Sequence, residues 1–157
     1  GSITIGSLEK HITETAWEKG WIKPIVSSKK RNQKVAIIGS GPAGLAAATY
    51  LIEYGYDVEV FEKNDRIGGL MIYGIPNFKL DKSVVIRRHE WLKESGVIFH
   101  TNCEVGKDIT FDDLEKNFDA ILISTGVYKA RSLDLNTNKV NKVADNNPPI
   151  TTVANGF

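Results

Sequence analysis

The sequence has little cysteine, no long apolar run and almost no net charge. Its single cysteine, Cys103, has no partner for an internal disulfide and cannot alone hold an iron–sulfur cluster or a cysteine-rich zinc site. No apolar run approaches the roughly 18 residues that cross a bilayer. The net charge of +1 gives no electrostatic reason to bind nucleic acid or an anionic membrane. We therefore expect a cytoplasmic protein without a membrane or nucleic-acid partner.

Patterns typical of catalytic residues and metal ligands are also missing. The three histidines, His11, His89 and His100, lie far apart in the sequence and do not have the spacing of metal ligands. The context suggests no arrangement of serine, histidine and aspartate for nucleophilic catalysis. We therefore predict no catalytic residue and no metal ligand in this chain.

The composition that remains is that of one globular domain, with 41% apolar and 25% charged residues. Residues 3–33 predict a short helix, capped by Ser7 and ended near Gly20, followed by a polar linker. Residues 34–131 alternate strand and helix patterns. Residues 132–157 are rich in asparagine and have no apolar period, so we expect an irregular tail there.

The middle segment predicts an α/β fold. Short β-branched runs indicate buried strands, and longer segments rich in helix formers lie between them. The predicted strands are 34–38, 57–62, 97–100 and 119–124, and the predicted helices are 45–54, 81–95 and 111–117. We predict a parallel sheet in a Rossmann-like FAD/NAD(P)-binding domain, with an irregular loop over 63–80.

The turn between the first strand and the first helix carries the main functional signal. Residues 39–44 (GSGPAG) fit the pattern G-x-G-x-x-G. Gly39 allows the tight turn, Gly41 lets the backbone approach a pyrophosphate, and Gly44 lets the helix pack against the strand. Pro42 suits the first turn of that helix. The helix N-terminus then offers free N–H groups to the phosphates.

The end of the second strand and the loop after it refine this prediction. Glu62 lies about 20 residues after the turn, where a carboxylate accepts hydrogen bonds from ribose hydroxyls. A 2′-phosphate would be repelled there, although the neighbouring Lys63 weakens this argument. The pair Gly68 and Gly69 lets a second backbone segment approach the ligand, which favours the longer cofactor FAD over NAD.

Residues 35–82 closely resemble the small (beta) subunit of bacterial NADPH-dependent glutamate synthase. The resemblance begins at Ile3 and extends to about Arg131. Its other specific segments are 3–6, 16–21, 102–108 and 124–131. It implies the fold of an FAD-binding domain and glutamate synthesis as the function of the full-length protein.

The resemblance also implies roles for individual residues. Leu70 would lie along the cofactor beside the paired glycines, and Lys79 matches a basic position that reaches FAD. Val105 matches a backbone contact to adenine, and Thr125 with Gly126 matches a turn where a later strand passes the cofactor. The complete set of expected FAD-binding residues is Gly39, Gly41, Pro42, Ala43, Gly44, Glu62, Lys63, Gly69, Leu70, Lys79, Val105, Thr125 and Gly126.

In the family that the chain resembles, FAD passes electrons from NAD(P)H to iron–sulfur clusters, and a large subunit is the partner. This chain has one glycine fingerprint and one cysteine, so NADPH and the clusters are expected only in the full-length family member. We expect a fragment that is inactive alone and whose FAD occupancy is open. Two alternatives remain: a single-Rossmann NAD-binding dehydrogenase, and a non-catalytic remnant or docking module.

Overall fold

The computed structural model describes residues 4–127 and has a four-stranded parallel sheet at its centre. The strands are β1 (Lys34–Ile38), β2 (Asp57–Phe61), β3 (Ile98–His100) and β4 (Ala120–Ile123). The helices are α1 (Ile5–Glu18), α2 (Pro42–Glu53), α3 (Leu70–Tyr73), α4 (Lys82–Glu94) and α5 (Phe111–Asn117). The predicted α/β fold with a parallel sheet is confirmed.

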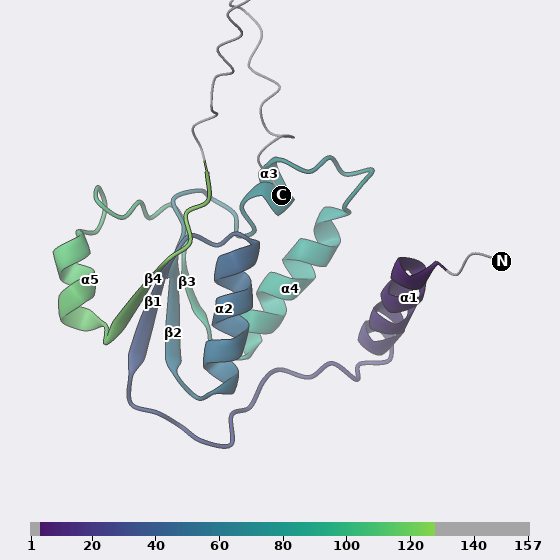
Figure 1. Cartoon of the computed structure of the whole chain (residues 1–157), viewed down its shortest axis with the longest axis horizontal. Coiled ribbons are helices and arrows are strands. Elements are labelled where there is room, and N and C mark those ends of the chain that lie inside the picture. The colour runs from purple at the N-terminus through teal and green to yellow at the C-terminus, as the bar shows by residue number, and fades with distance from the viewer. Residues whose placement is uncertain (1–3, 128–157) are drawn as a thin grey trace, which may run out of the picture.

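The strand order is β3-β2-β1-β4, so β1 pairs with β2 on one side and with β4 on the other. Helices α2 and α4 lie on one face of the sheet, and α5 lies on the other (Figure 1). After β1 the chain adds β2 and β3 on one side of it and then crosses over to add β4 on the other side. In open α/β sheets such a switch point opens a crevice at the carboxyl ends of the strands.

The two central strands, β1 and β2, are buried on both faces of the sheet, because neighbouring residues of a strand point to opposite sides and each side is covered there. On the face covered by α2 and α4, Ile37 and Val60 belong to the larger core cluster, with Leu92 of α4. On the face covered by α5, Ala36 and Leu114 belong to the second cluster. Two-sided burial explains why β1 is a continuous apolar run rather than an alternating one.

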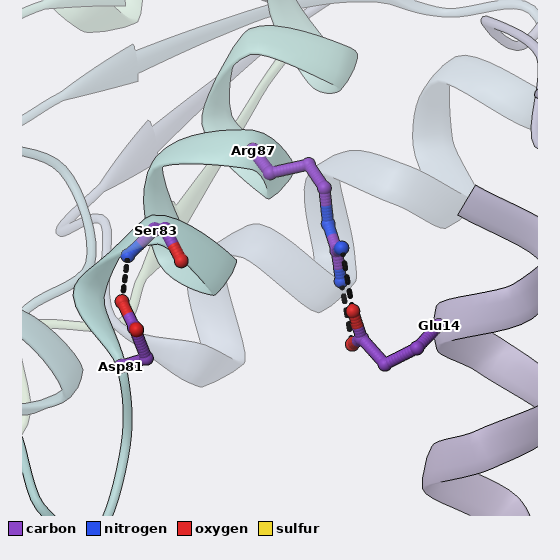
Figure 2. A network of polar contacts seen from close by, with 4 residues as sticks. All are labelled: Glu14, Asp81, Ser83 and Arg87. Carbon is purple, nitrogen blue, oxygen red and sulfur yellow. Dashed lines mark hydrogen bonds and ion pairs between the residues drawn. The ribbon is translucent and has the colours of Figure 1, made fainter. Parts of the chain in front are cut away.

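Most predicted elements begin and end within a residue of the observed ones. Helix α2 begins at Pro42, three residues before the predicted start, and Pro42 lies in its first turn as predicted. Asp81 caps α4, because its side chain accepts a hydrogen bond of 2.8 Å from the Ser83 N–H (Figure 2). That bond lowers the pKa of Asp81. The loop prediction for 63–80 was incomplete, since it contains the single turn α3.

The prediction that Ser7 caps the N-terminal helix was wrong. The helix begins at Ile5, with Thr4 at the cap position and no side-chain cap bond. The Ser7 N–H already bonds to the Thr4 carbonyl at 3.1 Å, so Ser7 lies inside the first turn. The end was predicted correctly, since the helix stops at Glu18 and Gly20 follows with φ +63°.

Helix α1 buries none of its own residues and is attached to α4 through a few polar and aromatic contacts. Both oxygens of Glu14 accept hydrogen bonds from the Arg87 guanidinium at 2.9 Å, which lowers the pKa of Glu14 (Figure 2). The same guanidinium lies over the Trp17 ring, 4.6 Å from its centroid. Trp17 in turn meets the edge of Trp91 on α4.

The segment between α1 and β1 follows the surface of the domain and is held by main-chain contacts. The Ile25 N–H donates to Ser95 Oγ at 2.9 Å, and the Trp91 indole N–H donates to the Lys23 carbonyl at 2.8 Å. The predicted tail lies outside the described residues, and so do residues 128–131 of the predicted domain. Within residues 4–127, no helix has both the length and the apolar character needed to span a bilayer.

Candidate functional site

A cleft of about 190 Å³ lies at the carboxyl ends of β1, β2 and β4, where the switch point places it. Four separate segments of the chain form its wall. The residues that line it are Ile38, Gly39, Phe61, Glu62, Lys63, Cys103, Glu104, Val105 and Thr125. The lining combines strand-end apolar side chains with one buried carboxylate, a composition typical of a small-molecule site.

The structure brings five of the predicted site residues together in this cleft: Gly39, Glu62, Lys63, Val105 and Thr125. They are up to 86 residues apart in the sequence and meet because parallel strands present their carboxyl ends at one edge. Four lining residues were missed, namely Ile38, Phe61, Cys103 and Glu104. Ile38 and Phe61 could have been found from their positions at the ends of the predicted strands. Cys103 and Glu104 could have been found because they directly precede Val105 in the sequence.

The glycines of the turn fill three different roles in the structure. A Cβ on Gly39 would lie 2.5 Å from the Ser124 carbonyl oxygen, and its φ is +100°. A Cβ on Gly44 would lie 2.1 Å from the Gly39 carbonyl oxygen. A Cβ on Gly41 would have no neighbour within 4 Å. Positions 39 and 44 therefore require glycine for the protein's own packing, whereas Gly41 borders open space.

The paired-glycine loop comes close to this open space. Gly69 has φ +53°, and a Cβ on it would lie 3.0 Å from the Cα of Gly41. Gly68 has φ +126° and its added Cβ would overlap Val85 of α4. The backbones of the glycine turn and the paired-glycine loop therefore approach each other at Gly41 and Gly69, with no side chain between them.

The Glu62 carboxylate is buried, with 3% of its surface exposed, and it joins three segments of the site. Its Oε2 accepts from the Ser40 N–H at 3.1 Å and from the Ser40 hydroxyl at 2.6 Å. Its Oε1 accepts from the Asn64 N–H at 2.9 Å and from Asn64 Nδ2 at 2.8 Å. The Ser40 oxygen also accepts from the Gly68 N–H at 3.2 Å. Sequence reasoning missed Ser40 and Asn64, because nothing in the motif marks their side chains.

Val105 and Cys103 contribute differently to the other side of the cleft. The Val105 N–H and C=O form no hydrogen bond with any residue of the described range 4–127. A free donor and acceptor on one residue can pair with a heterocycle edge. Burial, and secondarily the charge of Asp108, raises the pKa of the Cys103 thiol. Cys103 lies in the loop after β3 and packs against the second core cluster.

The remaining predicted residues do not line this cleft. Gly41, Pro42, Ala43 and Gly44 form the start of α2, and Gly69 and Leu70 form the start of α3. Lys79 is exposed, and Gly126 has φ +71° with open space around it. Their contacts with a cofactor stay predictions. No group of three or more histidine, cysteine or acidic residues is placed to hold a metal within residues 4–127.

Comparison with known proteins agrees with this geometry. The family model of the NAD(P)-binding Rossmann-like domain matches residues 37–85, which contain the glycine turn and Glu62. The small chain of NADPH glutamate synthase from Azospirillum brasilense is 53% identical over 133 residues, 85% of this chain and 28% of its own length. That of Bacillus subtilis (strain 168) is 48% identical over 132 residues, 84% and 27% respectively.

The chain is a relative of the glutamate synthase small chain. The predicted resemblance is thereby confirmed, and the chain spans just over a quarter of the length of these small chains. The fold also matches Mycobacterium tuberculosis FprA, solved in complex with NADPH, with a TM-score of 0.60 and 24% identity. That match covers 66% of this chain and 25% of FprA. This relative of the small chain therefore has a Rossmann-like NAD(P)-binding domain with a parallel sheet.

Proposed function

We propose that this chain binds FAD through the cleft and the adjoining glycine turn, as part of a glutamate synthase small-chain-like oxidoreductase. The observation that supports it most is the open space at Gly41, two residues along the chain from Gly39, which lines the cleft together with Glu62 and Val105. Packing within the protein accounts for glycine at positions 39 and 44 but not at 41. A ligand that passes close to the backbone accounts for Gly41.

The dinucleotide would lie with its pyrophosphate at Gly41 and the first turn of α2. The first N–H groups of a helix have no partner within the helix, and the helix dipole favours a negative charge at this end. Helix α2 has no acidic residue in its first turn and no side-chain cap bond, so its N-terminus is free to receive an anion.

The adenosine half would occupy the cleft itself. The Glu62 carboxylate would accept a ribose hydroxyl, and the N–H and C=O of Val105, which bond to no residue within 4–127, would pair with the adenine edge. The side chains of Ile38 and Phe61 supply apolar surface for the ring. A 2′-phosphate would bring a second negative charge to Glu62, so this site favours FAD or NAD over NADP.

FAD is favoured over NAD because a second glycine segment, at Gly69, approaches the same point as Gly41. FAD, when bound, supplies the chemistry by accepting a hydride and releasing electrons singly. The residues of this chain supply binding and orientation only. In the whole protein, NAD(P)H would be the donor, iron–sulfur clusters the acceptors, and a large subunit the partner, with the complex in the cytoplasm.

The experiment is a titration of the purified chain with FAD, followed by flavin absorption and fluorescence. We expect binding that ADP reverses and that adenosine 2′,5′-bisphosphate reverses at least tenfold less well, because its 2′-phosphate meets Glu62. Glu62→Ala should weaken FAD binding, and Glu53→Ala, which removes an exposed carboxylate from α2, should not. Thermal unfolding of each variant separates loss of the site from loss of the fold.

Two results would reject the proposal. If wild-type protein binds neither FAD nor ADP at millimolar concentration, the chain is a non-catalytic remnant. If NAD binds at least tenfold more tightly than FAD, the site belongs to a single-Rossmann NAD-binding protein, the alternative that the name of the matching family model favours.

A further inference from the structure

The hydrogen bonds of Glu62 leave no acceptor position open for a ribose. A carboxylate offers about four lone-pair positions, two on each oxygen. In this chain Ser40 fills both positions of Oε2, and Asn64 fills both positions of Oε1. Only 3% of the Glu62 surface is exposed. A ribose hydroxyl can therefore bind Glu62 only if one of the four donors leaves.

The four donors differ in how easily they can leave. The two backbone donors are fixed by the conformation of the turns that carry them. The Ser40 side chain is fully buried, and its oxygen also accepts the Gly68 N–H, so its rotation would leave that N–H without a partner. The Asn64 side chain is half-buried, and its Nδ2 has Glu62 as its one hydrogen-bond partner among the described residues. Asn64 is the donor that can move.

We propose that Asn64 is a specificity-determining positioning residue whose carboxamide occupies the place of a ribose hydroxyl on Glu62 Oε1 and gives it up on binding. This inference rests on the proposed function, because it concerns the same adenosine site. A ligand with ribose hydroxyls replaces the Asn64 bond with its own. A ligand without them cannot, and it leaves Asn64 in place.

The proposal predicts whether removal of the Asn64 side chain strengthens or weakens ligand binding. If Asn64 competes with the ribose, its removal frees Oε1 and tightens the binding of a ribose-containing ligand. If Asn64 instead helps to hold the ligand, its removal weakens binding. A net hydrogen bond corresponds to a change of roughly three- to tenfold in an equilibrium constant.

The test is calorimetric titration of wild type, Asn64→Ala and Asn117→Ala with ADP and with 2′,3′-dideoxy-ADP. Asn117 is a matched control, since its amide bonds to the Asp113 carbonyl on α5 and the residue does not line the cleft. We expect Asn64→Ala to bind ADP about three- to tenfold more tightly than wild type and to bind the dideoxy ligand unchanged. Asn117→Ala should match wild type with both ligands.

If Asn64 had a purely structural role, its removal would change the affinities for both ligands by the same factor. The ratio of the affinity for ADP to that for the dideoxy ligand is therefore the decisive readout. Weaker or unchanged ADP binding by Asn64→Ala overturns the inference while leaving the proposed function standing, provided that wild type binds ADP. An equal change for both ligands overturns it as well. Absence of ADP binding by wild type and by the variant overturns the inference together with the proposed function.

Discussion

Replacing Gly41 by alanine tests whether ligand binding, rather than packing within the protein, requires glycine at this position. Gly41 has φ −68° and ψ −177°, an extended conformation that alanine adopts before a proline without strain. The added Cβ meets no atom within 4 Å. As a helix cap, alanine lowers the free energy of unfolding relative to glycine by up to about 1 kcal/mol. Alanine also reduces the conformational entropy of the unfolded chain, which raises the free energy of unfolding by about 0.4–1 kcal/mol. We therefore expect stability within about 1 kcal/mol of wild type, and a melting temperature within roughly 4 °C.

Binding should respond very differently. A backbone N–H bonds a phosphate oxygen at about 2.7–3.2 Å, and a methyl group at this point keeps the oxygen farther away. We expect FAD affinity to fall at least tenfold, measured by fluorescence titration beside thermal unfolding. Gly6→Ala is the control for the same change in open surroundings on α1, and it should bind normally. Gly44→Ala should instead unfold the domain, because its Cβ would overlap the Gly39 carbonyl. Tight FAD binding by Gly41→Ala would refute the placement of the pyrophosphate.

Two further predictions concern the helices. Arg87→Ala removes the two hydrogen bonds to Glu14 and the contact with Trp17. Amide hydrogen exchange in α1 should therefore speed up roughly three- to tenfold, while the β1 amides stay protected. Lys93→Ala, on the same helix as Arg87, should leave exchange in α1 unchanged. Equal exchange in both variants would mean that α1 is held elsewhere. Thr110 and Asp113 form a capping box at the start of α5, and the hydrogen bond from the Thr110 hydroxyl lowers the pKa of Asp113 in the folded chain below the ordinary 3.8. The capping box therefore stabilises the fold above pH 3.8 and loses this effect as pH falls through the lowered pKa. The stability difference between wild type and Thr110→Val, measured by urea unfolding, should therefore shrink as pH falls below 3.8, and a difference that grows on acidification would contradict this sign.

Much of the fold could be predicted because its signals are local. Residues 34–38 (KVAII) and 57–61 (DVEVF) are rich in β-branched and aromatic residues, which favour a strand locally. Asp81 and Thr110 mark helix starts through bonds to residues two or three positions away. Ser7 failed as a cap because the preceding residues were themselves able to join the helix, which propensity alone does not decide.

The site was predictable only where a short motif carries its own steric reason. By itself, the sequence determined the α/β alternation, the glycine turn and the acidic residue after the second strand. Tertiary structure alone decided that Gly39, Glu62 and Val105 meet in one cleft, and that Gly41 faces open space while Gly44 faces backbone. It alone decided that Ser40 and Asn64 saturate the Glu62 carboxylate. These facts depend on strand order and on side chains far apart in sequence, and no local pattern records which segments the sheet brings together.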